Sequence, residues 1–256
     1  MNVVILAGGF GTRISEYTGV IPKPMVPIGG KPIIWHIINN FASFGLNNFY
    51  LALGYKSEII KDYFANYHTL NSNFSVDLSS GEIDLISNSN TNWKVNLIDT
   101  GLNSMTGGRV KRIFQNMEKK RFILTYGDAL CDVNIEELLK FHDNHKKMIT
   151  VTAVRPSARF GELELEEDNV LSFKEKPQTS SGWINGGFFV IEPEFIDLIA
   201  DDSTVLEKSP LEKASELGQL MAYKHDGFWQ CMDTKRDQEK LQEIWDDGSI
   251  QWLPKI

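Results

Sequence analysis

The first two dozen residues combine glycines and cations in a pattern suited to a phosphate group. Three glycines follow the short apolar run at residues 3–6, and they are Gly8, Gly9 and Gly11. Without Cβ atoms they let backbone N–H groups approach an anion closely. Arg13 adds a fork of donors that matches phosphate oxygens. Lys23 lies between two prolines, which predicts a stiff extended segment that restricts its ammonium group.

This pattern predicts a nucleoside triphosphate site. The residues expected at the nucleotide are Leu6, Ala7, Gly8, Gly9, Phe10, Gly11, Thr12, Arg13 and Lys23. Two better-known motifs do not fit: a dinucleotide fingerprint needs glycine where Ile14 stands, and a Walker loop needs Ser or Thr where Pro32 stands. An NAD-dependent oxidoreductase is therefore disfavoured. A plain glycine-rich connection is the simpler interpretation, but it does not require the two cations.

The surrounding pattern predicts an α/β fold. Strands are expected at 2–6, 48–54, 95–99 and 122–126, and helices at 32–44, 58–67, 134–145 and 235–245. The alternation predicts a Rossmann-like mixed, mostly parallel central sheet flanked by helices, with a binding crevice at the carboxyl ends of its strands. An antiparallel hairpin at 74–86 is expected to project, and the strands predicted from 149 to 191 form a smaller β-rich lobe.

Composition narrows the classes of function. The chain has 256 residues, 42% of them hydrophobic, and a net charge of -8, which disfavours nucleic acid and anionic membranes as partners. A small polyanion needs only local positive charge, available from Arg13, Lys23, Arg109, Lys111 and Arg112. No bilayer-spanning segment or signal peptide is evident, so we expect a cytoplasmic protein. Two cysteines give no disulfide framework, and five histidines show no metal-ligand spacing.

Six further blocks make a family resemblance specific. They are PKPM at 22–25, SMTGGR at 104–109, TYGD at 125–128, FKEKP at 173–177, INGGFFV at 184–190 and FWQCMDT at 228–234. With LAGGFGTR at 6–13 they resemble the sugar-1-phosphate nucleotidyltransferases, and most of all the members that use CTP and glucose 1-phosphate. The resemblance implies Mg²⁺-dependent transfer of a cytidylyl group from CTP to a sugar 1-phosphate, with release of pyrophosphate.

The resemblance also assigns residues. It implies catalytic roles for Arg13 and Lys23, nucleotide contacts from Ser104, Arg109 (near the pyrimidine) and Gly127, sugar contacts from Glu175, Lys176, Asn185 and Gly187, and metal binding by Asp128 and Asp233. Residues 1–256 would form one domain, with a nucleotide-binding half at 1–148 and a sugar-binding half with the C-terminal helix at 149–256. A homo-oligomer is implied, with a hexamer as one option.

Several alternatives stay open at this stage. The same chemistry with UTP, dTTP or another phosphorylated acceptor is one, and an inactive ligand-sensing homologue is another. Locally, Asn185-Gly186-Gly187 fits either a hairpin turn or a strand with a gap for a sugar ring. Ser104 or Thr106 fits as a cap of the next helix, which also offers a second anion site. Asp132 fits as the cap of the helix at 134–145 and Thr234 as that of the last helix.

Overall fold

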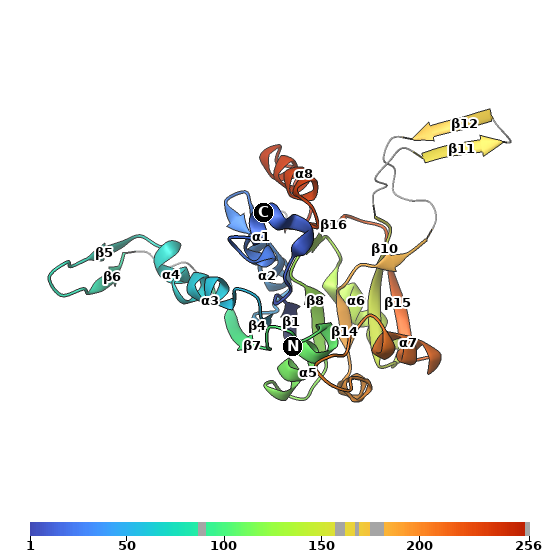
Figure 1. Ribbon diagram of the computed structural model, residues 1–256, viewed down its shortest axis with the longest axis horizontal. Helices are drawn as coiled ribbons and strands as arrows, with labels where there is room; N and C mark the ends of the chain where they lie inside the picture. Colours follow the sequence, from blue (N-terminus) through green and yellow to red (C-terminus); the bar gives the residue numbers. More distant parts are fainter. Residues whose placement is uncertain (87–90, 157–161, 167–168, 175–181, 254–256) are drawn as a thin grey trace.

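The central element of the fold is one twisted sheet. The computed structural model describes residues 1–86, 91–156, 162–166, 169–174 and 182–253. Eight strands of this part of the chain form the sheet, in the order β13-β10-β14-β8-β1-β4-β7 with β15 paired to β10 (Figure 1). The predicted α/β class, with a mostly parallel sheet flanked by helices, is confirmed.

Four parallel strands lie within residues 1–148, as predicted. They are β1 (Asn2–Leu6), β4 (Asn48–Leu53), β7 (Lys94–Asp99) and β8 (Phe122–Tyr126). In β1, Val4 pairs with Tyr50 on one side and Leu124 on the other. Val3, Val4 and Ile5 are fully buried because helices cover both faces, which explains the unbroken apolar run. The carboxyl ends of these strands therefore meet at one edge of the sheet.

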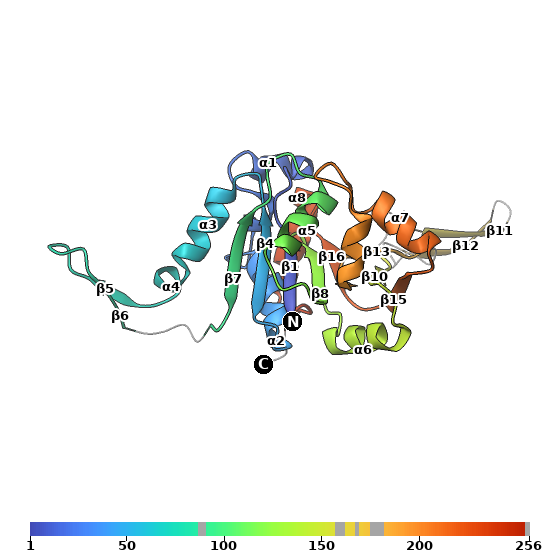
Figure 2. The same cartoon turned by 90° about the horizontal axis from the view of Figure 1, so that it is seen from below.

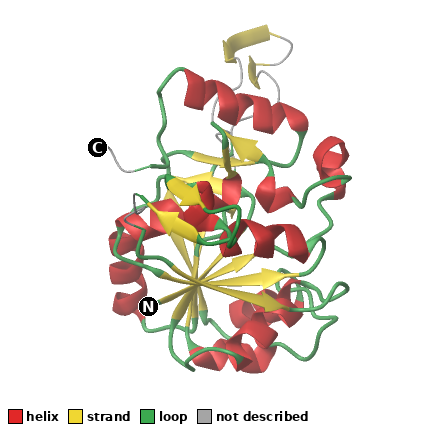
Figure 3. Cartoon of the chain, turned by 90° about the vertical axis from the view of Figure 1, so that its left-hand side faces the viewer, coloured by secondary structure: helices red, strands yellow, loops and turns green. Residues whose placement is uncertain are grey.

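Helices form a layer on each face of the sheet (Figure 3). One core contains Val3 and Ile5 and packs against α2 (Ile33–Ser43), α6 (Ile135–His145) and α8 (Lys235–Asp246). The other core contains Val4 and packs against α5 (Thr106–Gln115), α7 (Ser209–Glu216) and the 3-10 helix η3 (Pro193–Leu198). Among the described residues, no helix combines the length and apolar character needed to cross a bilayer.

The strands of the second half extend the same sheet. They are β10 (Ile149–Val154), β13 (Ile184–Asn185), β14 (Phe189–Ile191) and β15 (Leu220–His225). Both β13 and β14 run antiparallel to β10, so the segment at 183–191 is one interrupted strand and not a hairpin turn. Ile149 pairs with Ile191, and Val154 pairs with Ile184. Between these two pairs β10 advances by five residues and the facing segment by seven. The facing segment therefore has two extra residues, which bulge out around Gly186 and Gly187.

Two antiparallel pairs project from opposite ends of the molecule in Figure 1. The first is the predicted hairpin, formed by β5 (Phe74–Val76) and β6 (Ile83–Leu85). It follows α3 (Ser57–Ala65) and α4 (Tyr67–Leu70), which replace the single helix predicted at 58–67. The second pair is β11 (Glu162–Glu166) with β12 (Asn169–Lys174). The projecting hairpin of the prediction is thus confirmed.

The carboxyl ends of the parallel strands point toward the top of Figure 2, where α1 (Ser15–Thr18) lies, and several short elements complete this half of the fold. Besides α1 they are η1 (Thr12–Ile14), η2 (Lys23–Met25), β2 (Pro27–Ile28), β3 (Lys31–Pro32), β9 (Ala129–Cys131) and β16 (Trp229–Cys231). The extended segment predicted around Lys23 was wrong. Lys23 begins a 3-10 turn because Pro24 takes the second position, where no N–H is needed.

Two helix caps test the local predictions. Thr234 caps α8 as predicted, and its hydroxyl oxygen accepts from the N–H of Asp237. The predicted cap at Asp132 was wrong. Asn134 caps α6 by accepting from the N–H of Glu137, because Val133 separates Asp132 from the capping position.

Candidate active site

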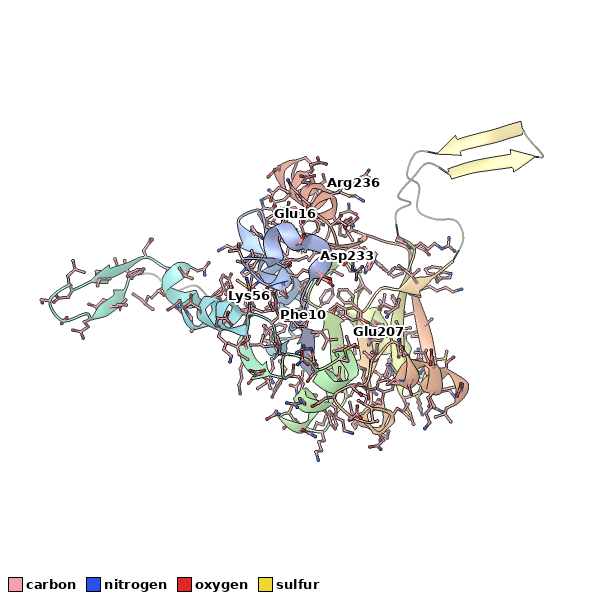
Figure 4. The ribbon with its side chains drawn as sticks, viewed as in Figure 1. Phe10, Glu16, Lys56, Glu207, Asp233 and Arg236 are labelled. Carbon is pink, nitrogen blue, oxygen red and sulfur yellow. The ribbon has the colours of Figure 1, made fainter. Side chains whose placement is uncertain are left out.

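A cavity of about 560 Å³ opens at the carboxyl ends of β1 and β8. This volume lies within the range of small-molecule sites, which is about 300–1,000 Å³. All twelve residues predicted to contact the nucleotide line it, as do Asp128 and Tyr126. The strand ends therefore bring together residues from 6–23, 102–109 and 126–128. In Figure 4, Phe10, Asp233 and Glu207 lie around the centre of the face on which the cavity opens.

The glycine loop offers unused donors to this cavity. Within the described chain, the backbone N–H groups of residues 9–12 donate no recorded hydrogen bond. Gly11 has φ +63°, and a Cβ there would lie 2.8 Å from Thr18 Cγ2, so glycine is required. Free N–H groups on a bent glycine loop are the arrangement that binds a phosphate.

Four charged side chains converge beside the loop. Lys23 Nζ donates to Asp128 Oδ2 and to Asp233 Oδ1, both at 2.6 Å. Arg13 Nη1 donates to Asp233 Oδ2 at 2.5 Å. The two predicted catalytic cations and the two predicted metal ligands thus form one connected group, although Arg13 and Asp233 are separated by 220 positions in the sequence.

Burial differs sharply within this group. The side chain of Lys23 is 10% exposed and that of Asp233 15%, whereas that of Arg13 is 74% exposed. Burial lowers the pKa of Lys23, but the carboxylates of Asp128 and Asp233 outweigh it and raise the pKa above its ordinary value. Lys23 therefore stays charged at neutral pH, and the guanidinium of Arg13 has room to contact a ligand.

Two local structures position the carboxylates. Asp128 directly precedes β9, and Asp233 follows β16 by two residues, while β9 and β16 pair as an antiparallel ribbon. The carboxylate of Asp237 accepts from the backbone N–H groups of Asp233 and Thr234, at 3.1 and 2.8 Å. Asp237 was missed in the sequence, although the spacing Thr-x-x-Asp resembles a capping box.

Arg109 lines the cavity, but its terminal N–H groups bind the protein itself. Nη1 donates to Leu53 O and Thr100 Oγ1, and Nη2 donates to Gly8 O and Leu102 O. A Cβ at Gly8 would lie 2.3 Å from Nη1, so this glycine admits the guanidinium. The guanidinium thus ties the glycine loop to β4 and to the loop at 100–102, and its place near the pyrimidine stays a prediction.

The expected anion site at the start of α5 is not present. The N–H groups of Met105, Gly107 and Gly108 donate to the carbonyls of Asp202 and Thr204. No side chain caps the helix. Ser104 Oγ instead donates to Thr100 O, at 2.5 Å. Gly107 and Gly108 let the 202–204 loop pack closely, because a Cβ at either would lie within 2.8 Å of it.

The segment at 199–202, which leads into this loop, binds two cations that were expected to supply charge for a ligand. Lys111 Nζ donates to the carbonyls of Ile199 and Ala200, and Arg112 pairs with Asp202. Both therefore fasten α5 to this segment and are not available to the cavity, which corrects the expectation for Lys111 and Arg112.

The predicted sugar residues are only partly described. Glu175 and Lys176 lie outside the described residues. Asn185 Nδ2 donates to Tyr126 Oη at 3.2 Å, and Asn185 Oδ1 accepts from the N–H of Gly187. The space beside Gly187 is filled by the ring of Tyr126, whose Cδ2 would lie 3.0 Å from an added Cβ. Tyr126 thus occupies the side of Gly187 on which a side chain would lie, and the sugar contacts of Asn185 and Gly187 stay a prediction.

A network that sequence reasoning missed connects this region to α5. Tyr126 Oη donates to Glu207 Oε1, and Thr106 Oγ1 donates to Glu207 Oε2, both at 2.6 Å. Burial and the Glu207 carboxylate raise the pKa of Tyr126, so its hydroxyl stays protonated. No sequence signal marks Glu207, because its partners are 81 and 101 positions away.

Replacing Arg109 by methionine should reduce the free energy of unfolding by about 3 kcal/mol or more, because several buried acceptors lose their donor. Urea unfolding measures this change. The matched control is Arg112→Met on the same helix, whose ion pair is exposed to solvent and should contribute far less to stability. Equal stability of the two variants would contradict the anchoring role of Arg109.

Known proteins similar to this chain share one family. The family described as "Nucleotidyl transferase" matches residues 2–251. A glucose-1-phosphate cytidylyltransferase of Salmonella typhi is 46% identical over 253 residues, which cover 98% of each chain. A probable glucose-1-phosphate cytidylyltransferase of Bacillus subtilis is 39% identical over 98% of this chain and 99% of its own length.

A solved structure agrees in fold. HddC from Yersinia pseudotuberculosis is 27% identical, has a TM-score of 0.71 and covers 95% of this chain, with 99% of its own length matched. A second structure of HddC, in complex with GMP-PN, has a TM-score of 0.68. The similarity thus extends over nearly the whole chain and includes a protein that was crystallised with a nucleotide analogue.

Proposed function

Since the chain belongs to the nucleotidyl transferase family, we propose that it transfers a cytidylyl group from CTP to α-D-glucose 1-phosphate, giving CDP-glucose and pyrophosphate. The identity to cytidylyltransferases over nearly the full length supports CTP and glucose 1-phosphate as substrates. The observation that carries the proposal is the group formed by Lys23, Arg13 and two aspartates at the mouth of a cavity with free loop amides.

The reaction requires two anions to meet. The phosphate of the sugar attacks the α-phosphorus of CTP, and the bond to the β-phosphate oxygen breaks. A phosphate monoester has a second pKa of about 6, so the nucleophile is already largely dianionic at neutral pH and needs no general base. The chain's contribution is to hold both phosphates in line and to neutralise their charge.

The positions of the cations fit this task. The loop N–H groups of residues 9–12 can donate hydrogen bonds to triphosphate oxygens. Lys23 provides a buried charge of fixed position, which stabilises developing negative charge more than an exposed one. Arg13, exposed and on the other side of Asp233, can close onto the phosphates as they bind.

A divalent cation fits the two carboxylates. Asp128 and Asp233 converge on one cationic nitrogen, which shows that their oxygens already favour a positive charge between them. Asp128 and Asp233 would hold the ion, and Mg²⁺ is the proposed one because it prefers hard oxygen ligands together with phosphates. When bound, such an ion neutralises phosphate charge. Lys23 would then exchange a carboxylate partner for a phosphate oxygen.

The decisive experiment is a pyrophosphate-release assay with Mg²⁺, CTP, UTP, dTTP, GTP and a panel of sugar 1-phosphates. We expect the highest kcat/KM with CTP and glucose 1-phosphate. A higher value with another nucleotide or acceptor would refute the proposed substrates. No release with any pair, while CTP still binds in calorimetry, would favour a ligand-sensing protein.

We propose further that the protein is a homo-oligomer assembled through the β5–β6 hairpin. Four apolar side chains share one face of the hairpin, since Phe74 pairs with Leu85 and Val76 with Ile83. Each is more than 40% exposed, and Figure 1 shows the hairpin far from the sheet. An exposed apolar face of this kind favours burial against another chain, here a second copy.

The double variant Val76→Asp/Ile83→Asp should therefore lower the molar mass in solution toward the 29.1 kDa of one chain. Light scattering after size exclusion measures the mass and gives the subunit number of the unmodified protein, for which a hexamer is one option. The matched control is Ser75→Asp, on the opposite face of the hairpin. An unchanged mass in the double variant would exclude this interface.

A further inference from the structure

Another group of potential metal ligands lies at the opposite end of the ribbon that carries Asp128 and Asp233. Ala129 pairs with Cys231 near those aspartates, whereas Cys131 pairs with Trp229 at the other end. There Cys131 and Asp132 lie beside His225, the last residue of β15. Neither the proposed reaction nor the cavity uses these three residues.

Their ligand atoms are close enough to share an ion. The sulfur of Cys131, a carboxylate oxygen of Asp132 and a ring nitrogen of His225 all lie within 4.8 Å of one another. His225 Nε2 and Asp132 Oδ1 are hydrogen-bonded at 2.8 Å. Zn²⁺ binds such ligands at about 2.0–2.3 Å, so ligand atoms around one ion are about 3–4 Å apart. Small side-chain rotations would complete the site.

The backbone holds the three residues together. The N–H of Asp132 donates to Phe228 O at 3.2 Å, which ties the end of β9 to the turn after His225. A Cβ at Gly227 would lie 2.5 Å from Asp132 Oδ1 and 2.9 Å from His225 Nε2, so only glycine allows this turn to approach the pair. The turn is therefore closed tightly around the carboxylate and the imidazole.

Burial and ligand chemistry indicate which ion would bind. Cys131 is fully buried, whereas the side chain of Asp132 is 34% exposed and offers an entry path. A thiolate, an imidazole and a carboxylate suit a borderline-soft ion such as Zn²⁺, with water as the fourth ligand. Mg²⁺ prefers oxygen ligands and would instead favour Asp128 and Asp233.

We propose that Cys131, Asp132 and His225 form a binding site for Zn²⁺ or a similar transition-metal ion. Binding there fastens β9 to the end of β15 and the turn before β16. The ion would thereby stabilise the ribbon whose other end positions Asp128 and Asp233. This site is independent of the proposed substrates, and it can exist whether or not the transferase assignment holds.

Titration of the reduced, chelator-treated full-length protein with Co²⁺ in the presence of excess Mg²⁺ tests this proposal. We expect one equivalent of Co²⁺ to produce a thiolate-to-cobalt charge-transfer band and the intense visible bands of a tetrahedral site. Zn²⁺ should abolish these bands and raise Tm. The absence of a charge-transfer band in the unmodified protein would overturn the proposal.

Variants locate the site. Cys131→Ser should remove the charge-transfer band, whereas the matched control Cys231→Ser, on the paired strand, should keep it. His225→Gln should weaken Co²⁺ binding by about 10-fold or more, and it tests the site even if Cys131→Ser does not fold. Loss of the band from Cys231→Ser, or unchanged Co²⁺ affinity in His225→Gln, would overturn the assignment.

Discussion

Replacing Lys23 by methionine should lower kcat by about 10²-fold or more, equivalent to about 2.7 kcal/mol of transition-state stabilisation. The side chain keeps its length but loses the ammonium group that bridges Asp128 and Asp233. A buried, preorganised charge contributes mainly in the transition state, so KM for CTP should change less than kcat. Pyrophosphate release at saturating substrates measures the effect.

A readout other than activity separates this role from simple loss of structure. Without Lys23 the two carboxylates face each other with no cation between them, so the variant should have a lower Tm in chelator than the unmodified protein. Mg²⁺ should then raise Tm of the variant by more than it raises that of the unmodified protein. The control Lys56→Met removes a half-buried lysine that lies outside the cavity lining and donates to Gly19 O, and it should leave kcat unchanged. An unchanged kcat in Lys23→Met would refute the catalytic role.

The parts of the fold predicted from sequence are those encoded locally. The apolar run at 3–6 indicated a strand buried on both faces, and the 3.6-residue spacing at 33–41 indicated α2, since burial sets both patterns directly. The glycine loop was recognisable for a similar reason. Three glycines follow one strand directly, Gly11 adopts positive φ, and Arg13 comes two residues after it.

Local sequence patterns did not predict which distant residues a given side chain or glycine would contact. The small-residue loop before the helix at Thr106 predicted a second anion site, but the group that approaches Gly107 and Gly108 is the 202–204 loop. Arg109 was predicted by resemblance to lie near the pyrimidine, and nothing in its own sequence context indicated that the acceptors of its N–H groups are mostly backbone carbonyls, which every residue possesses. Because every residue has a backbone carbonyl, the residue types do not indicate which carbonyls will accept from an arginine. The contacts of Arg109 could therefore not be predicted from the sequence.

Contacts between segments far apart in the sequence could be predicted only from the family resemblance. No local sequence pattern connects Lys23 with Asp233. Only the family resemblance predicted that both lie at one site, and in the structure Lys23 Nζ donates to Asp233 Oδ1. Glu207 had no such support and was missed. His225 and Asp132, 93 positions apart, likewise showed no metal-ligand spacing in the sequence. The sheet topology brings such pairs together by placing β9 against β16.

Replacing Asp233 by asparagine should lower kcat by about 10²-fold or more, because it weakens a proposed metal ligand and removes the charge that holds both Lys23 and Arg13. The amide keeps the shape of the carboxylate, and the capping box of Thr234 and Asp237 is untouched, so the fold should persist. The pyrophosphate assay, repeated over a range of Mg²⁺ concentrations, should also show a higher Mg²⁺ requirement.

The double variant Lys23→Met/Asp233→Asn then tests whether these residues act as one unit. Because each removes the same ion pair, the combined loss in kcat should be smaller than the product of the single losses. Asp143→Asn is the matched control, since Asp143 also pairs with an arginine at 2.5 Å but lies outside the cavity, and its kcat should stay normal. Fully multiplicative losses would mean that Lys23 and Asp233 contribute independently, contrary to the shared site.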